Sequence, residues 1–158
     1  MDRDRFIAEV KVQQNALRSF LLALCGGDKA EADDIAQETF VKAYLAIDRY
    51  RDSGQFRAWL FKIAHNTFLS NVSGQRGHDP LERVSAVPAN ERSDSGFEHQ
   101  ELYMALSALP PKERSAITLF YLSGHSIKEI AAITDTSEDA VKKQLSRGRE
   151  KLKDIIRR

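Results

Sequence analysis

The sequence predicts an all-α protein of two small helical domains joined by a flexible linker, the C-terminal domain containing a helix-turn-helix. Apolar residues recur at helical spacing along most of the chain, and no stretch shows the alternation of a half-buried strand. Residues 74–96 instead hold Gly, Pro, Ser and charged residues, which favours a linker. The predicted parts are a domain at 1–75, a linker at 76–96 and a domain at 97–158. We expect two such domains to be positioned independently on a large partner.

Three helices are predicted in the N-terminal domain. The first covers about residues 4–24 and ends at Gly26-Gly27. The second covers about 30–49, and the third runs from about 56 to 72, after the interruption "YRDSGQ". One stripe of the second helix is expected to be buried and comprises Ala36, Phe40, Ala43, Tyr44 and Ile47.

A second stripe on the same helix is not required by the core. Asp34, Glu38, Val41 and Leu45 follow one another at spacings of four, three and four residues. Carboxylates beside exposed aliphatic side chains suit docking on a partner helix that carries Arg or Lys. The alternative is that another helix of the domain covers Val41 and Leu45, and periodicity alone leaves both interpretations open.

The third helix carries polar and aromatic groups along one side, among them Trp59, Lys62 and Asn66. An indole with an ammonium and an amide can stack on unpaired bases and bond to their edges. Because the single Trp of a small domain is usually part of its core, a structural role for Trp59 also stays open.

The C-terminal domain contains the helix-turn-helix. Its helices are predicted at about 97–108, 111–123, 126–133 and 137–156. Ser126 and Glu129 form a capping box at the start of the third of these helices. Asp135 ends that helix, and Thr136 or Ser137 can cap the next. Two short helices separated by such a turn are typical of a groove-reading unit, whose second helix enters the major groove.

The last predicted helix has one apolar and one basic side. Its core side is expected to comprise Val141, Leu145, Gly148, Leu152 and Ile155, and its other side Lys142, Lys143, Ser146 and Arg147. From Lys142 to Arg158 there are eight cations and two anions, a local charge of +6 in a chain of net charge +1. This favours duplex DNA as the partner, read at base edges and phosphates. A solvated basic helix is the plainer alternative.

Several other classes are disfavoured. The histidines are scattered, with no cysteine or carboxylate at metal-ligand spacing and no Gly-rich phosphate loop, so we expect no enzyme, no metal and no cofactor. Cys25 is the single cysteine, which fits a reducing, cytoplasmic location. No apolar run approaches the roughly 18 residues that a membrane span needs, so no membrane insertion is expected.

Two long stretches together resemble one known family. "EADDIAQETFVKAYLAIDRYRDSGQFRAWLFKIAHN" and "LPPKERSAITLFYLSGHSIKEIAAITDTSEDAVKKQLSRGREKL" closely resemble, in this order, the extracytoplasmic-function (ECF, group IV) sigma factors, small bacterial subunits that direct RNA polymerase to particular promoters. The resemblance implies core RNA polymerase as a partner, through the clamp helices of its largest subunit and its flap region. It also implies promoter DNA and an anti-sigma factor as partners.

The resemblance assigns three groups of site residues, all as expectations. Polymerase binding is implied for Asp34, Gln37, Glu38, Val41 and Leu45. Recognition of the −10 element, including capture of a flipped-out base, is implied for Arg51, Asp52, Ser53, Gln55, Trp59, Lys62 and Asn66. Recognition of the −35 element is implied for Ser137, Lys142, Lys143, Ser146, Arg147, Arg149 and Lys151. The family usually shows an acidic residue and then arginines after the position of Asn66, where this chain has "TFLSNVSGQRG".

Two alternatives from other functional classes remain at this point. A sigma-like mimic would bind an anti-sigma factor without directing transcription, although it would have no need of a basic recognition helix. A stand-alone helix-turn-helix regulator would act without polymerase, and the N-terminal domain would then be unexplained.

Overall fold

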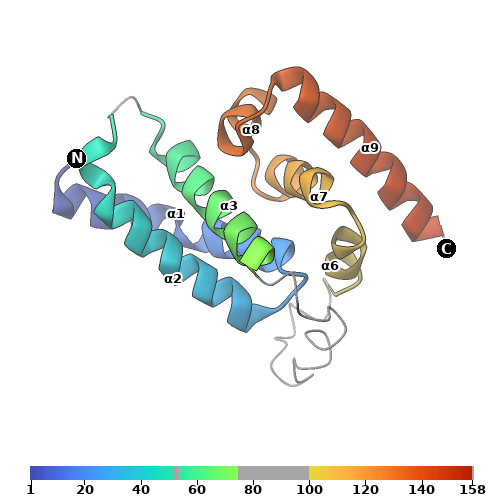
Figure 1. The fold of residues 1–158 in the computed structure, drawn as a ribbon, viewed down its shortest axis with the longest axis horizontal. Coiled ribbons are helices and arrows are strands. Elements are labelled where there is room, and N and C mark those ends of the chain that lie inside the picture. The colour runs from blue at the N-terminus through green and yellow to red at the C-terminus, as the bar shows by residue number, and fades with distance from the viewer. Residues whose placement is uncertain (52–53, 75–99, 158) are drawn as a thin grey trace.

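The computed structural model describes residues 1–51, 54–74 and 100–157, and the regular structure of this part is helical (Figure 1). The predicted all-α class is therefore confirmed. Asp52, Ser53 and the predicted linker 76–96 lie outside the described residues. None of the described helices is both long and apolar enough to cross a membrane.

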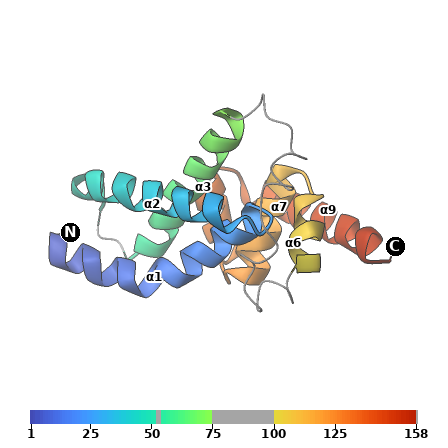
Figure 2. The same ribbon diagram turned by 90° about the horizontal axis from the view of Figure 1, so that it is seen from below.

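The N-terminal lobe is formed by α1 (Arg3–Leu24), α2 (Lys29–Leu45), a 3-10 turn η1 (Ile47–Arg49) and α3 (Phe56–Gly74). Asp2 caps α1 by accepting a hydrogen bond from the Arg5 backbone N–H at 2.8 Å. Gly26 and Gly27 have φ values of 66° and 90°, which glycine adopts without strain, so the chain can reverse sharply into α2. The helices α1 and α2 pack against each other and α3 packs across both (Figure 2).

The second helix is shorter than predicted. It ends at Leu45, where the hydrogen bonding tightens: the Ala46 backbone N–H is shared between the carbonyls of Lys42 and Ala43, and a 3-10 turn then redirects the chain. This turn brings Tyr50 into the core, where its ring meets Phe56 at 5.6 Å between centroids. The expected burial of Tyr44 is wrong: this side chain is exposed, and its ring meets that of Phe6 edge-on with centroids 5.8 Å apart.

The C-terminal lobe contains α6 (Gln100–Ser107), α7 (Pro111–Ile117), a π-helical turn η3 (Thr118–Leu122), α8 (Ile127–Thr134) and α9 (Glu138–Arg157). The single helix expected at 111–123 is thus α-helical only as far as Ile117. In the wider turn that follows, the Ser123 backbone N–H bonds to the Thr118 carbonyl at 3.1 Å, five residues back. This turn leads into α8.

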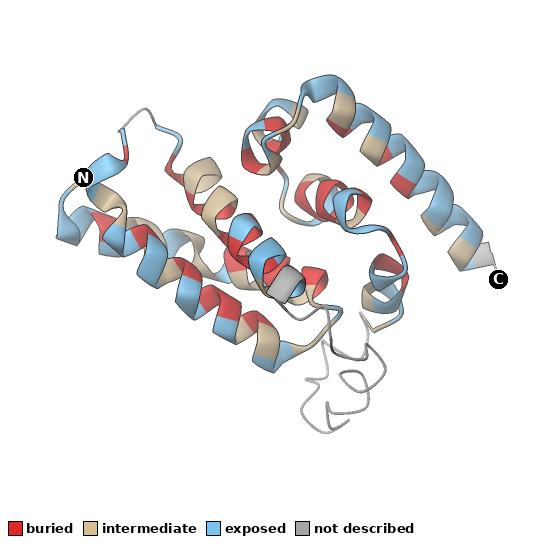
Figure 3. Cartoon of the chain, viewed as in Figure 1, coloured by how far each residue is buried: buried red, intermediate tan, exposed pale blue. Residues whose placement is uncertain are grey.

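The two lobes are in direct contact. The helix α3 packs against α8, and α1 packs against α6 and η3. Buried apolar side chains from both lobes form one hydrophobic cluster, which Figure 3 shows as buried faces turned toward the centre of the molecule. The structure therefore has the lobes packed together, and their independent positioning on a large partner stays a prediction.

Candidate nucleic-acid and protein interfaces

The helix-turn-helix is built as its sequence predicts. The Ser126 hydroxyl accepts a hydrogen bond from the Glu129 N–H, and the Glu129 carboxylate accepts one from the Ser126 N–H, both at 3.1 Å. Partial burial raises the pKa of Glu129. The hydrogen bonds from Ser126 and His125 lower it by more, so the pKa of Glu129 lies below its usual value. The α8 helix ends at Asp135, whose left-handed backbone (φ 56°) makes the turn. Ser137 is the cap of α9, because its hydroxyl accepts from the Ala140 N–H at 3.1 Å.

The recognition helix α9 separates a buried face from a basic face. Val141, Leu145 and Gly148 are buried, and Leu152 and Ile155 pack against the core. The opposite face is exposed and carries Lys142, Lys143, Ser146 and Arg147. Gly148 is required by close packing, since a Cβ atom there would lie 2.7 Å from Cγ1 of Ile117. This contact lets α9 pack closely on α7 and thereby fixes the direction in which the basic face of α9 points.

Two further basic residues of α9 also make contacts within the lobe. Arg149 donates from Nη1 to the Tyr121 hydroxyl at 3.0 Å, and Lys151 donates to both carboxylate oxygens of Glu113 at 3.0 and 2.8 Å. Both remain exposed. Sequence periodicity placed them at the flank of the basic face but gave no sign of these partners.

A recess lies at the N-terminal end of α3. Its volume is about 310 Å³, and its walls are Arg49, Tyr50, Arg51, Gln55, Ala58, Trp59, Lys62 and Ala132. Trp59 is half-buried and stacks at a tilt on Tyr50, with centroids 5.0 Å apart. This indole therefore supports the core and also forms a wall of the recess, so the two interpretations of Trp59 are compatible.

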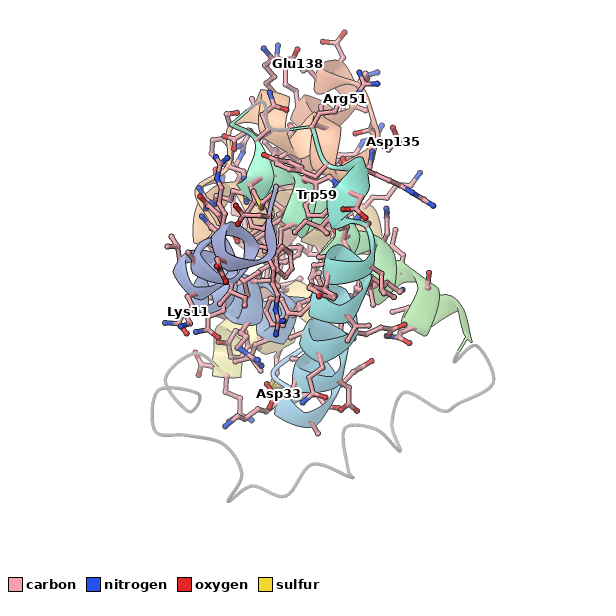
Figure 4. All side chains as sticks on the ribbon, turned by 90° about the vertical axis from the view of Figure 1, so that its left-hand side faces the viewer. Lys11, Asp33, Arg51, Trp59, Asp135 and Glu138 are labelled. Carbon is pink, nitrogen blue, oxygen red and sulfur yellow. The ribbon has the colours of Figure 1, made fainter. Side chains whose placement is uncertain are left out.

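The recess combines predicted and unpredicted residues. It brings together four of the expected −10 residues, Arg51, Gln55, Trp59 and Lys62. Asn66 is exposed on α3 outside it, and Asp52 and Ser53 lie outside the described residues. Sequence reasoning missed Arg49, Tyr50 and Ala58, although Arg49 and Tyr50 directly precede the interrupting loop. It also missed Ala132, which α8 contributes from the other lobe (Figure 4 shows Arg51 and Trp59 at the same end of the molecule as Asp135 of the turn).

The second stripe of α2 is exposed. Val41 is 58% exposed and Leu45 is 75% exposed, so no described helix covers either side chain. Asp34, Gln37 and Glu38 are exposed beside them. Glu38 pairs with Lys42 at 3.2 Å and accepts a long hydrogen bond from Asn71 at 3.5 Å. The alternative that the lobe buries this stripe is thereby excluded for the described residues.

Buried histidines lie where the lobes meet. Burial lowers the pKa of His65 to about 4. Burial also lowers the pKa of His125, and the charge of the nearby Arg57 lowers it further. The hydrogen bond and the charge of Glu129 raise this pKa but do not offset the lowering. In residues 1–51, 54–74 and 100–157, no three His, Cys, Asp or Glu side chains are grouped as a metal site would need.

The fold and these surfaces define a class: a two-lobe helical protein with a helix-turn-helix, a recess lined by aromatic and polar side chains, and a separate exposed stripe of acidic and apolar side chains on α2. Comparison with known families agrees. Residues 10–77 match sigma-70 region 2, and residues 99–152 match sigma-70 region 4.

Individual relatives give the same result. The chain is 34% identical over 148 residues to the ECF RNA polymerase sigma-E factors of Salmonella typhimurium and of Escherichia coli strain K12, covering 81% of this chain and 77% of each relative. It is 32% identical over 155 residues to the ECF sigma factor SigE of Mycolicibacterium smegmatis, covering 92% of this chain and 60% of that relative's length.

Solved structures extend the likeness to three dimensions. The sigma factor RpoE in complex with the anti-sigma factor NepR from Bartonella quintana superposes with a TM-score of 0.81 at 29% identity, covering 97% of each chain. CnrH in complex with the cytosolic domain of CnrY gives 0.76 at 26% identity, covering 98% of this chain and 89% of CnrH.

The chain belongs to the ECF sigma factors of the sigma-70 family, the RNA polymerase subunits that direct transcription initiation. Sigma factors are initiation factors and not enzymes. Membership of this family implies binding to RNA polymerase and to promoter DNA.

Proposed function

We propose that this chain binds core RNA polymerase through α2 and directs initiation at promoters that it reads with two separate surfaces. The observation that carries the proposal is the presence on one chain of an exposed acidic and apolar stripe on α2 and an exposed basic face on α9. The first suits a protein helix rich in Arg or Lys, and the second suits the DNA major groove.

Each surface takes one task in this proposal. Asp34, Gln37, Glu38, Val41 and Leu45 bind the clamp helices of the largest polymerase subunit. The recess beside Trp59 receives an unpaired −10 base, held by stacking and by the polar groups of Arg51, Gln55 and Lys62. The basic face of α9 enters the major groove of the −35 element.

The C-terminal lobe also carries an apolar groove that suits a second contact with polymerase. Its walls include Leu102, Tyr121, Leu122 and Ile156, all exposed, and Arg149 and Lys153 lie at its edge. We assign the flap region of polymerase to this groove. An anti-sigma factor that covers these surfaces would keep the chain inactive, and the solved relative RpoE, bound to the anti-sigma factor NepR, supports such a partner.

The proposal is tested by adding the purified chain to core polymerase and measuring run-off transcripts from genomic promoter fragments. We expect specific start sites that core polymerase alone does not use. A sigma-like mimic would leave start-site choice unchanged, and a stand-alone regulator would bind the DNA without being retained by immobilised core polymerase. Either result contradicts the proposal.

A further inference from the structure

A cleft of about 610 Å³ lies at the junction of the two lobes, with walls from α3, from α7 and from α9. Its volume falls within the range of about 300–1,000 Å³ that is typical of sites for small molecules. The cleft shares no residue with the recess beside Trp59 or with the exposed stripe of α2. Neither polymerase docking nor the capture of a −10 base therefore accounts for it.

Three exposed cations border the cleft. Lys112 lies in the first turn of α7, and Lys143 and Arg147 lie one turn apart on α9. Within residues 1–51, 54–74 and 100–157, none of the three forms an ion pair or donates a side-chain hydrogen bond. The wall also contains Glu113, but both oxygens of this carboxylate already accept from Lys151. The cleft therefore has an excess of positive charge, which attracts an anionic ligand.

Two buried polar side chains also line the cleft. His65 is 5% exposed and Ser115 is 1% exposed, and Nε2 of His65 lies 3.0 Å from the Ser115 hydroxyl. Burial lowers the pKa of His65 to about 4, so its ring is neutral at pH 7. The second ring nitrogen, Nδ1, is buried and has no hydrogen-bond partner in the described part of the chain. Because buried polar groups are nearly always hydrogen-bonded, this unpaired nitrogen favours a further bonding group at the site.

One wall of the cleft is apolar. Leu69 of α3 is 41% exposed, and Pro110 and Pro111 at the start of α7 are exposed as well. An aliphatic side chain and two pyrrolidine rings can cover a planar ring and remove its apolar surface from water. The ligand that suits this cleft therefore carries a ring beside its anionic group.

Polar groups on α9 add selectivity. The guanidinium of Arg147 can bind a phosphate group through two parallel hydrogen bonds. Gln144, half-buried in the same wall, offers an amide that both donates and accepts, as the edge of a nucleobase requires. Anion, ring and base edge together are the chemistry of a nucleoside phosphate. Cations supplied by two different helices suit more than one phosphate group.

Duplex DNA does not account for the whole cleft. Lys143 and Arg147 also belong to the proposed −35 surface, and DNA can reach them at the rim. The major groove of B-DNA alone is about 12 Å wide, so a duplex cannot enter a cleft of about 610 Å³. His65 and Ser115 are buried and are beyond the reach of such a partner.

We propose that this cleft is a binding site for a nucleoside diphosphate, whose phosphates are held by Lys112, Lys143 and Arg147 and whose base is covered by Leu69 and the two prolines. This site goes beyond the proposed function and does not rest on it. Its test needs neither polymerase nor promoter DNA, so a failure of this proposal would leave the proposed function standing.

Binding is measured by isothermal titration calorimetry on the full chain at physiological ionic strength. The probes are ADP, GDP, the two parent nucleosides and inorganic pyrophosphate. We expect ADP or GDP to bind saturably, with one molecule per chain, and pyrophosphate and the nucleosides to bind at least tenfold more weakly. The proposal is overturned if neither nucleotide binds saturably. Equal affinity for pyrophosphate also overturns it, because the cations would then attract any anion.

Two variants locate the site, and each has a matched control. Leu69→Ala removes the apolar cover, and Val72→Ala changes a residue of the same helix that lies outside the cleft and is 39% exposed. We expect Leu69→Ala to weaken nucleotide binding at least fivefold while pyrophosphate binding stays within about twofold, and Val72→Ala to change neither. If Leu69→Ala binds the nucleotide as Val72→Ala does, the base does not lie in this cleft.

Lys112→Glu reverses one of the three charges, and Lys11→Glu on the exposed surface of α1 is the control with the same change in net charge. Both positions are exposed, so the fold tolerates either change, and circular dichroism verifies the helical content of each variant. We expect Lys112→Glu to weaken nucleotide binding at least tenfold and Lys11→Glu to leave it within about twofold. Equal affinities of these two variants would place the phosphates elsewhere and overturn the proposal.

Discussion

Lys151 on the recognition helix donates two hydrogen bonds, at 3.0 and 2.8 Å, to the carboxylate of Glu113 on α7. The side chain of Glu113 is only 10% exposed, whereas that of Lys151 is 47% exposed. A basic residue of the predicted DNA-binding set is therefore also the neutralising partner of a nearly buried carboxylate. With the packing of Gly148, this pair fixes α9 on the lobe.

We predict that Lys151→Ala destabilises the C-terminal lobe by about 1–3 kcal/mol, because Glu113 loses both charged hydrogen bonds in a poorly solvated position. Lys142→Ala removes an exposed charge and is expected to change stability by less than about 0.5 kcal/mol. Urea unfolding of the two variants measures the difference. Equal stabilities would show that the ion pair of Lys151 with Glu113 does not stabilise the packing of α9 on α7.

The close approach of α9 to α7 gives a second prediction. Gly148→Ala would place its Cβ 2.7 Å from Cγ1 of Ile117, and such overpacking typically costs about 1–3 kcal/mol, against a gain of about 1 kcal/mol in helix propensity. We expect a net loss of stability. Ile117→Ala should make room, so a double-mutant cycle should show the two changes costing less together than their sum. Additive effects would mean that the two residues do not crowd each other.

The features of the fold and of the candidate site that the sequence predicts are those set by residues close together in the chain. The two faces of α9 and the capping box of α8 follow from residues three or four positions apart, and both are confirmed. The early end of α2 depends on Tyr50 entering a core formed by distant helices, which periodicity does not report. The contact of Phe61 with His125 joins a helical side chain of one domain to a side chain in the turn before α8 of the other, and no local pattern in the sequence pairs the two. For the same reason Ala132 was not expected in the recess.

The docking stripe on α2 is tested by a reversal of charge. We predict that Glu38→Lys weakens binding to core polymerase at least tenfold, since it replaces an exposed carboxylate in the proposed interface by a cation facing basic partner residues. Glu101→Lys, at an exposed position on α6, is the matched control. Binding is measured with labelled chain and immobilised core enzyme. If the Glu38→Lys chain binds core polymerase as tightly as the control, Glu38 is not part of the interface.

The basic face of α9 is tested by Arg147→Ala. Arg147 is exposed, and loss of a bidentate contact from Arg to a base typically costs about 1–3 kcal/mol of discrimination. We expect transcription from −35-dependent promoters to fall by about fivefold or more, while binding to core polymerase stays within about twofold. Salt titration of holoenzyme binding separates a base contact from a phosphate contact, because only the phosphate contact changes the salt slope uniformly across sequences. A parallel loss of polymerase binding would contradict the division of tasks between the lobes.

The buried histidine at the junction predicts how stability depends on pH. Burial lowers the pKa of His65 to about 4, from 6.5 when exposed, so between these values the unfolded chain binds a proton that the folded chain does not. Stability is therefore full above about pH 6.5 and falls as the pH decreases toward 4, by up to about 3 kcal/mol from this residue. His125, whose pKa burial also lowers, acts in the same direction.

The contribution of His65 can be isolated by His65→Gln, which keeps a polar group near Ser115 but does not titrate. Urea unfolding of this variant and of the natural chain at pH 7.5, 6.5, 5.5 and 5.0 gives two stability profiles. We expect the difference in unfolding free energy to shrink as the pH falls below 6.5, because only the natural chain then loses the histidine's contribution. Carboxylates titrate in both chains and largely cancel in this comparison. Parallel profiles would mean that His65 gains a proton as readily in the folded chain as in the unfolded one, and the junction around Ser115 would then be open to water.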